Sequence, residues 1–396
     1  MNTKRYLSVL MLALFATIAF AQENMDEMIE RGLSVARAQS MIMAKSLESD
    51  TKALPRSFAK GKLVTSDYHW WCSGFFPGVL WQLYSDNGDE QLRRYAELYT
   101  DRVEMVKKKK DTHDLGFMLY CSFGQGYNLT GNKHYLDVII EGSGNLIGRY
   151  DDKVKAIKSW EPNERWKYPV IIDNMMNLEM LSFATRMTKD SKYLDIANTH
   201  AKTTIKNHFR DDYSTFHVIS YDPATGQPHA KNTAQGYSDP SAWARGQAWG
   251  LYGYTMMYRE TKQKEYLEQA RSIAKFIVEH PRLPEDGIPY WDFDAPNIPD
   301  ALRDASAGAV ICSALIELSQ LDSTADSKLW LETAERQLRA LSSSAYLVLP
   351  GELGGFILKH SVGSLPGKSE VDVPLTYADY YYIEALLRMK KLRSSR

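Results

Sequence analysis

Three acidic residues each stand directly before a long apolar segment: Asp114 in Thr-His-Asp-Leu-Gly, Asp173 in Ile-Ile-Asp-Asn-Met and Asp304 in Arg-Asp-Ala-Ser. An Asp in such a place is usually a helix N-cap, because its side chain accepts a hydrogen bond from a free backbone N–H. A carboxylate can also bind sugar hydroxyls or transfer a proton. The neighbouring residue types decide between these two roles.

Aromatic residues stand in similar positions, before apolar segments. The chain has 9 Trp and 24 Tyr, and this group includes Trp71, Trp243, Trp249 and Tyr377. Taken singly, each has an ordinary alternative as a core residue. Together with the carboxylates they predict a carbohydrate site, because an aromatic face stacks on the apolar face of a sugar ring.

Arg245, in Trp-Ala-Arg-Gly-Gln-Ala-Trp, is the cation of this group. Helix N-termini add partial positive charge, so the site suits an acidic carbohydrate. The whole chain has 48 Lys and Arg against 49 Asp and Glu, which leaves a net charge of −1. An anionic substrate must therefore be recognised by local groups, and we expect no nucleic-acid partner.

A repeated pattern predicts the elements that position these residues. A polar turn, then Tyr or Trp with an apolar neighbour, then an amphipathic segment recurs at Tyr135, Tyr193, Tyr266 and Trp330, with spacings of 58, 73 and 64 residues. A weaker copy ends at Tyr95. Periods of this size indicate a repeated supersecondary unit, here a pair of helices.

The two helices of each unit differ in character. One is amphipathic and needs covering on one side, as in 266–278, whereas the other is apolar on almost every side and must be enclosed. Segments of the enclosed kind are 117–123, 175–184, 248–258, 307–318 and 377–389. Six units of about 60 residues predict an all-α fold, an (α/α)6 toroid of six inner and six outer helices, with an open solenoid as the alternative.

In a closed toroid the inner helices run the same way, so the loops that lead into them meet at one mouth. These loops carry most of the Trp, Asp and Arg residues singled out above, whereas the loops at the other end hold ordinary turn residues. We therefore expect the functional site at the mouth where the inner helices begin.

The first 21 residues have the pattern of a cleavable signal peptide. Lys4 and Arg5 precede the apolar run 7–20, and Ala19 and Ala21 supply the small residues that signal peptidase requires, so we expect cleavage before Gln22. The run is shorter than a membrane-spanning helix of ~20 residues, although an uncleaved anchor is the alternative. We expect an exported, periplasmic protein without a membrane anchor.

The remaining residues, 22–396, are predicted to form a single catalytic domain. Cys72, Cys121 and Cys312 are too few for a disulfide framework, and their apolar neighbours favour buried structural thiols. The sequence has no HExxH, CxxC or Walker-type motif. No metal and no cofactor are expected.

A family resemblance covers the chain from about Trp71 to Leu387, with the motifs in order. The sequence resembles glycoside hydrolase family 88, the unsaturated glucuronyl hydrolases, most distinctively in its 243–250 block. The related family 105, the unsaturated rhamnogalacturonyl hydrolases, matches this block less well. The motifs are Trp71-Cys-Ser-Gly-Phe-Phe-Pro-Gly, Thr112-His-Asp-Leu-Gly-Phe, Ile172-Asp-Asn-Met-Met-Asn, Phe216-His217, Gln235-Gly-Tyr, Trp243-Ala-Arg-Gly-Gln-Ala-Trp-Gly, Asp304-Ala-Ser-Ala and Tyr377-Ala-Asp-Tyr-Tyr.

The resemblance implies an unusual reaction. Family 88 enzymes release the 4,5-unsaturated uronic acid that polysaccharide lyases leave at the non-reducing end, by hydrating its vinyl ether. By motif, Asp173 is implied to be the general acid/base and Asp114 the second essential carboxylate, which holds ring hydroxyls and influences the pKa of Asp173. Burial among aromatic residues and a neighbouring carboxylate would both raise that pKa.

The resemblance also implies the substrate contacts. Trp71 and Trp249 would form aromatic walls, His217 and Gln235 would bond the sugar or the water, Arg245 with Trp243 would hold the uronate end, and Tyr377 would close the mouth. His217 has an alternative as an ordinary core histidine. The run Lys107–Lys110 could contact sulfate, but a solvated turn is the preferred interpretation.

The expected substrate is an unsaturated oligosaccharide of glycosaminoglycan type. Two alternatives remain at this point: an unsaturated rhamnogalacturonyl hydrolase or another (α/α)6 sugar enzyme, and a non-catalytic oligosaccharide-binding toroid, because the fold alone does not fix function. The sequence leaves open the preferred disaccharide, its sulfation and the oligomeric state.

Overall fold

The structure is a computed structural model that describes residues 23–395. The expected signal peptide and its cleavage site before Gln22 lie outside the described residues. No helix within 23–395 is both long enough and apolar enough to cross a membrane.

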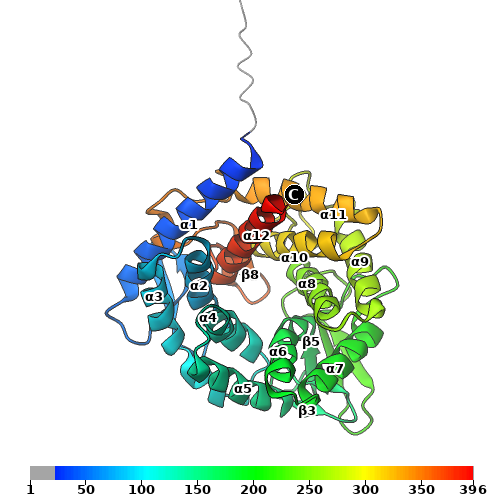
Figure 1. The fold of residues 1–396 in the computed structure, drawn as a ribbon. Coiled ribbons are helices and arrows are strands. Elements are labelled where there is room, and N and C mark those ends of the chain that lie inside the picture. The colour runs from blue at the N-terminus through cyan, green and yellow to red at the C-terminus, as the bar shows by residue number, and fades with distance from the viewer. Residues whose placement is uncertain (1–22, 396) are drawn as a thin grey trace, which may run out of the picture.

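Twelve α-helices within these residues form two concentric rings, as Figure 1 shows. The outer ring consists of α1 (Met25–Leu47), α3 (Glu90–Asp101), α5 (Lys133–Ile147), α7 (Lys192–His208), α9 (Lys264–Val278) and α11 (Asp326–Leu341). The inner ring consists of α2 (Phe75–Asn87), α4 (Gln125–Thr130), α6 (Leu178–Thr188), α8 (Ala244–Thr261), α10 (Ala305–Leu321) and α12 (Thr376–Ser394). The predicted (α/α)6 toroid of six inner and six outer helices is confirmed.

The ring is closed rather than open. Inner helices contact their neighbours in turn, and α12 returns to pack on both α2 and α1. Near the chain ends, Arg393 of α12 forms an ion pair with Asp26 of α1. The open solenoid is therefore excluded.

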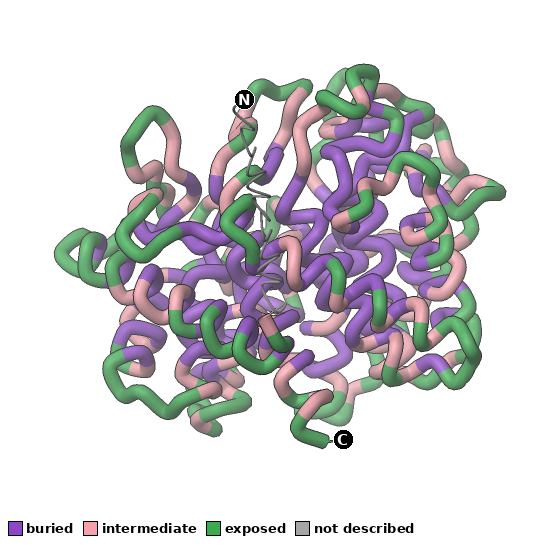
Figure 2. The backbone as a smooth tube through the Cα atoms, turned by 90° about the horizontal axis from the view of Figure 1, so that it is seen from above, coloured by how far each residue is buried: buried purple, intermediate pink, exposed green. Residues whose placement is uncertain are grey.

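The repeated aromatic residues anchor the outer helices, as the repeat predicted. Tyr95, Tyr135, Tyr193, Tyr266 and Trp330 are all buried, at 6% exposure or less. Each stands in the first half of an outer helix, where it packs into the core between the two rings. Figure 2 shows the buried stretches of backbone gathered in the middle of the molecule and the exposed stretches at its edge.

Two inner helices begin irregularly. A π-helical segment, η2 (Gly116–Gly124), precedes α4, and a 3-10 segment, η3 (Ile172–Asn177), precedes α6. The first follows Asp114 and the second contains Asp173. Irregular winding of this kind is frequent at functional sites, because it redirects side chains.

Short antiparallel strands, which were not expected, lie in the connections that lead into inner helices. They form three hairpin pairs and one three-stranded sheet of order β5-β6-β7. Their positions place them all at the mouth. The strands are β1 (Leu54–Ala59), β2 (Lys62–Ser66), β3 (Tyr150–Asp151), β4 (Ala156–Ile157), β5 (Pro169–Ile171), β6 (Val218–Tyr221), β7 (Pro228–Asn232), β8 (Ser361–Ser364) and β9 (Ser369–Val373).

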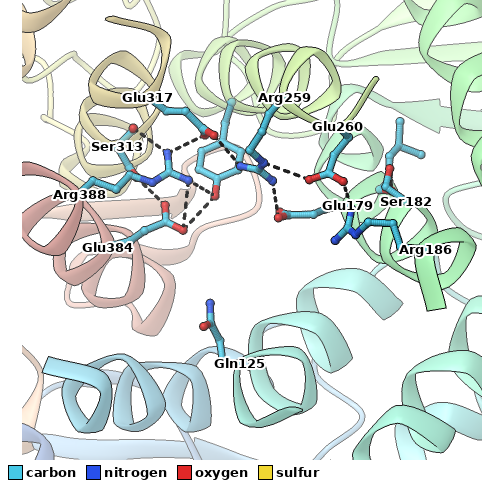
Figure 3. A network of polar contacts seen from close by, with 12 residues as sticks. Gln125, Glu179, Ser182, Arg186, Arg259, Glu260, Ser313, Glu317, Glu384 and Arg388 are labelled. Carbon is cyan, nitrogen blue, oxygen red and sulfur yellow. Dashed lines mark hydrogen bonds and ion pairs between the residues drawn. The ribbon is translucent and has the colours of Figure 1, made fainter. Parts of the chain in front are cut away.

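A network of ion pairs links four inner helices away from the mouth (Figure 3). Arg259 of α8 pairs with Glu179 of α6 and with Glu317 of α10. Arg388 of α12 pairs with Glu317 at 2.9 Å and donates to the Tyr252 hydroxyl of α8. Each arginine therefore joins three helices, and the network ties this half of the ring together.

Candidate active site

A cavity of about 190 Å³ opens where the inner helices begin. It brings together residues from four separate connections of the toroid and from the start of α8, which is the arrangement expected for the mouth. Its lining consists of Trp71, Thr112, His113, Asp114, Ser159, Trp160, Ile171, Asp173, Gln235 and Arg245. Both predicted catalytic carboxylates are among these residues.

Asp173 is the buried acid of the cavity. Its side chain is 11% exposed, and its Oδ2 atom has no hydrogen-bond partner among the described residues. Burial raises the pKa of Asp173 to about 6; Arg245 opposes the shift, and the negative charge of Asp114 adds to it. Such a carboxyl can hold a proton near neutral pH and give it to a substrate.

His217 points its second ring nitrogen at this acid. Its Nδ1 accepts hydrogen bonds from the backbone N–H groups of Ala234 (3.1 Å) and Gln235 (3.2 Å), so the neutral ring carries its proton on Nε2. Nε2 lies 3.6 Å from Asp173 Oδ2. Burial and the charge of Arg245 lower the pKa of His217 well below its ordinary value, which keeps the ring neutral.

The three-stranded sheet explains how these distant residues meet. Ile171 at the end of β5 pairs with Val218 at the start of β6, and the N–H of Ile172 donates to the His217 carbonyl (3.1 Å). Asp173 and His217 are therefore neighbours across the end of the sheet. Val218 also pairs with Asn232 of β7, which brings the following residues over the His217 ring.

Asp114 has a different environment. Its Oδ1 lies 3.1 Å from Nε2 of His113, its Oδ2 accepts from the Thr112 hydroxyl at 2.8 Å, and its side chain is 18% exposed. It is therefore the more accessible of the two carboxylates. Neither Asp114 nor Asp173 makes a side-chain cap bond to its helical segment, so the simple N-cap interpretation fails for both.

Asp304, by contrast, is an N-cap. Its Oδ1 accepts from the Ser306 N–H that begins α10, and its Oδ2 accepts from Arg245 at 2.9 Å. Arg245 also donates to the carbonyls of Val362 and Gly363, and its guanidinium lies over the Trp243 ring. This buried arginine is fixed in position at one wall of the cavity.

Only one of the four predicted aromatic site residues lines the cavity. Trp71 lines it, half-buried. Trp243 stacks against His217 with ring centroids 4.4 Å apart and supports the cavity from behind. Trp249 is fully buried against Phe117 and Tyr381, so the expected wall is absent at this residue.

Tyr377 is likewise placed differently from the expectation. Its ring lies 4.9 Å from that of Trp71 and is 1% exposed. It therefore supports Trp71 from beneath and does not close the mouth. Gln235 does line the cavity, and its Nε2 donates to the Gly363 carbonyl at 2.9 Å.

Five lining residues were not predicted as site residues from the sequence: Thr112, His113, Ser159, Trp160 and Ile171. His113 directly precedes Asp114 in the sequence, and a histidine next to a carboxylate is a signal that could have indicated it. Ser159 and Trp160 follow the short hairpin of β3 and β4, where no periodic pattern marks a position. Trp160 packs edge-on against Trp166 with centroids 5.3 Å apart.

The lysine run and the cysteines agree with their ordinary interpretations. Lys107 pairs with Glu104 and Lys108 with Glu141, and the run does not line the cavity. The three cysteines are free thiols. Within residues 23–395, no group of three or more His, Cys, Asp or Glu side chains is arranged to hold a metal ion.

Comparison with known proteins identifies the family. The model of glycosyl hydrolase family 88 matches residues 43–389. The chain belongs to glycoside hydrolase family 88. An unsaturated glucuronyl hydrolase of Formosa agariphila is 49% identical over 324 residues, covering 81% of this chain and 80% of the relative.

Two further relatives agree with this assignment. An unsaturated chondroitin disaccharide hydrolase of Streptococcus pneumoniae is 35% identical over 330 residues, which cover 81% of this chain and 82% of the relative. The crystal structure of an unsaturated glucuronyl hydrolase specific for heparin is 48% identical, with a TM-score of 0.90 over 93% of this chain and 98% of that one. The family 88 resemblance is confirmed.

Proposed function

We propose that this glycoside hydrolase releases the 4,5-unsaturated uronic acid from the non-reducing end of lyase-generated glycosaminoglycan oligosaccharides. The observation that carries the proposal is the buried carboxyl of Asp173 in one cavity with Asp114. The glycosaminoglycan class is supported by the relatives, which act on chondroitin disaccharide and heparin substrates.

The proposed reaction is a hydration. The C4=C5 bond of the unsaturated uronate is a vinyl ether, and the protonated carboxyl of Asp173 gives its proton to C4. Positive charge then forms on C5 and the ring oxygen. The Asp173 carboxylate takes a proton from a water molecule as the water oxygen bonds to C5, so one group serves as acid and then as base.

Bond cleavage follows from the hydrated product. The new hydroxyl on C5 makes a hemiketal, which opens by breaking the bond between C5 and the ring oxygen. The hemiacetal left at C1 then releases the remaining sugar as an alcohol. Each turnover consumes one water molecule and returns the proton to Asp173. No displacement at C1 occurs, so the usual relation between carboxylate separation and stereochemistry does not apply.

The other cavity residues have supporting roles in this scheme. The more exposed Asp114 accepts hydrogen bonds from ring hydroxyls, and the Nε2–H of His217 can hydrogen-bond the Asp173 carboxylate formed after proton transfer. If the 3.6 Å separation between His217 Nε2 and Asp173 Oδ2 shortens after proton transfer, this hydrogen bond stabilises the Asp173 carboxylate and not the protonated acid. Arg245 places positive charge near the substrate carboxylate.

Substitution of the acid tests the proposal. Asp173→Asn is expected to lower the rate of hydration of the unsaturated uronate at least about 10³-fold, because general acid–base catalysis contributes that order of rate. The rate is measured as the loss of ultraviolet absorbance that accompanies hydration. Asp137→Asn, an exposed change on α5, is the matched control and is expected to retain full activity. Full activity of Asp173→Asn would contradict the assignment, and binding without turnover in the wild type would favour an oligosaccharide-binding protein.

The location of this activity is also a proposal. Residues 1–21 have the sequence pattern of a cleavable signal peptide, which favours export to the periplasm. N-terminal sequencing of the protein purified from its own cells is expected to begin at Gln22. A purified chain that still begins at Met1 would contradict export by cleavage.

A further inference from the structure

A separate cavity, of about 390 Å³, lies at the outer rim of the toroid, between α7 and the turns of two hairpins. Figure 1 shows α7 and β3 next to one another at this rim. We call this cavity the lysine pocket. Its main lining residues are Lys153 and Lys155 of the β3–β4 turn, Lys202 and Lys206 of α7, and Gly226 and Gln227 of the β6–β7 turn. All of them differ from the residues that line the catalytic cavity.

The lysine pocket is held in shape by contacts among its three segments. Gly226 has a left-handed backbone with a φ of +72°, and a Cβ atom there would lie 2.1 Å from the carbonyl oxygen of Lys153, so the two turns touch. On the other side, Nδ1 of His200 in α7 accepts a hydrogen bond from the N–H of Ile157 in β4 at 3.0 Å. The helix and both turns therefore have fixed relative positions.

The pocket concentrates positive charge. All four of its lysines are exposed, and only Lys202 forms an ion pair within residues 23–395, with Glu265 at 3.0 Å. Lys202 and Lys206 are one helical turn apart, about 6 Å between Cβ atoms, where like charges repel each other. Among the described residues that line the pocket there is no Asp or Glu. In a chain with a net charge of −1, this cluster favours an anionic ligand.

Neutral groups of the pocket also suit an anion. Thr203 lies between the two lysines of α7, and Asn207 follows them; both line the pocket. The Asn207 amide donates one hydrogen bond to the Tyr221 hydroxyl at 3.1 Å, which leaves its second N–H for a ligand. A hydroxyl and an amide can each donate to a sulfate or carboxylate oxygen that is paired with an ammonium group.

The composition of the lining decides between kinds of polyanion. Among the described lining residues there is no aromatic side chain on which a nucleic-acid base could stack, and no Arg that could bind a phosphate through two hydrogen bonds. Separate lysines act as point charges, which suits sulfate and carboxylate groups spaced along a polysaccharide. The volume is in the range of small-molecule sites, so the pocket has room for part of a chain and not only for a single ion.

The lysine pocket is near the catalytic cavity but separate from it. Lys155 lines the pocket, and Ser159 lines the catalytic cavity. The two residues are four positions apart in the chain, so their Cα atoms are separated by no more than about 15 Å. A polysaccharide bound in the pocket would therefore keep the mouth of the toroid close to neighbouring chain ends.

We propose that the lysine pocket is a non-catalytic binding site for a sulfated stretch of glycosaminoglycan chain, which holds the enzyme on the polysaccharide. The choice of a glycosaminoglycan among sulfated polyanions rests on the proposed function. The site itself rests on the four lysines, their lack of acidic partners and the shape of the cavity.

Binding of a saturated heparin octasaccharide tests the proposal. Chemical cleavage without a lyase yields this probe with no C4=C5 bond, so it is not a substrate. Lys153→Gln/Lys206→Gln is expected to raise its Kd, measured by calorimetry in 0.15 M NaCl, about three- to tenfold, because two exposed charge interactions are lost. The desulfated octasaccharide should bind at least tenfold more weakly than the sulfated one.

The matched control removes two lysines outside the pocket. Lys133 and Lys264 begin α5 and α9, are exposed and form no ion pair within residues 23–395. Lys133→Gln/Lys264→Gln changes the net charge by the same amount and is expected to keep the Kd within twofold of the wild type. Equal Kd values for the two double variants would overturn the pocket proposal.

Hydration of the unsaturated disaccharide separates the pocket from the catalytic cavity. Lys153→Gln/Lys206→Gln should keep kcat and KM for this short substrate within twofold of the wild type, and a larger loss would overturn a non-catalytic role. A single-stranded DNA of equal charge that binds as tightly as the octasaccharide, and loses the same factor in the pocket variant, would overturn the polysaccharide assignment. Wild-type protein that binds the octasaccharide through the pocket but does not hydrate the disaccharide would overturn the proposed function and support the pocket.

Discussion

Asp173 gives the reaction its pH dependence. The catalytic form is the protonated carboxyl, whose pKa burial raises to about 6. We expect kcat to be level below this pH and to fall about tenfold per unit above it, because the proton donor is lost. Stopped or continuous ultraviolet assays between pH 4.5 and 8 would measure this. A kcat that stays constant from pH 5 to 8 would contradict the role of Asp173 as the acid.

Removal of the Asp114 charge should shift the pH dependence of kcat in one direction. Its negative charge is one of the influences that raise the pKa of Asp173, after burial. The residual activity of Asp114→Asn should therefore fall off at a lower pH than that of the wild type. A shift to higher pH would show that the interaction between the two carboxylates has been assigned the wrong sign.

The burial of Asp173 is also expected to lower the free energy of unfolding at neutral pH. A pKa raised from 3.8 to about 6 means that the folded protein binds this proton more tightly than the unfolded chain. The stability due to protonation is fully present below pH 3.8 and is lost as the pH rises to about 6. Asp173→Asn should therefore raise the free energy of unfolding at pH 7–8 by up to about 3 kcal/mol.

Denaturant unfolding at several pH values measures this gain. The difference between Asp173→Asn and the wild type should disappear near pH 4, where the carboxyl is neutral in both states. Asp137→Asn should show no such trend, because Asp137 is exposed. A gain that is as large at pH 4 as at pH 7.5 would have a cause other than the charge of Asp173.

The sequence was sufficient for the carboxylates but not for the direction of every aromatic side chain. Asp114 and Asp173 were predicted to share one site because both precede inner helices, and the structure brings them to one cavity. Trp249 and Tyr377 also stand at the start of inner helices, but their rings turn into the core. The position of a residue at the start of an inner helix does not decide whether its side chain points into the cavity or into the core.

At the scale of elements, the buried ion pairs are expected to hold the inner ring together. Arg259→Met removes the link from α8 to α6 and α10; it takes from Glu179 its ion-pair partner, whereas Glu317 keeps Arg388. We expect a loss of about 1–3 kcal/mol in the free energy of unfolding, since these groups are only partly exposed. Activity per folded molecule should be unchanged, because Arg259 lies about 21 Å along α8 from Arg245.

Arg186→Met is the matched control for this prediction. Arg186 pairs with Glu260 in the same network, but its side chain is 49% exposed. An exposed pair contributes less than about 1 kcal/mol. Thermal unfolding of both variants should therefore separate them, and a larger loss for Arg186→Met than for Arg259→Met would contradict the order of burial.

Helices and strands differ in how far they could be predicted. The repeated aromatic anchors and the contrast between enclosed and amphipathic segments located both rings, because each extends over many residues. The strands have two to six residues each, too few for an alternating pattern to be distinct. The sheet of β5, β6 and β7 that brings His217 to Asp173 therefore became visible only in the structure.

At the scale of the whole molecule, ring closure creates the site. The closed ring, in which α12 packs on α2, brings four connections that are far apart in sequence to one cavity. The composition allowed one or two domains, and the repeat of about 60 residues favoured a single closed one. The volume of the cavity could not be predicted, since it depends on how the connecting loops pack.

In the proposed reaction the enzyme hydrates C4=C5 instead of displacing the group at C1. Turnover in D₂O, followed by NMR in its first minutes, tests this most directly. Hydration predicts that the first released product carries one deuteron at C4, placed on a single face by Asp173. Release of uronate with the C4=C5 bond still intact would contradict it.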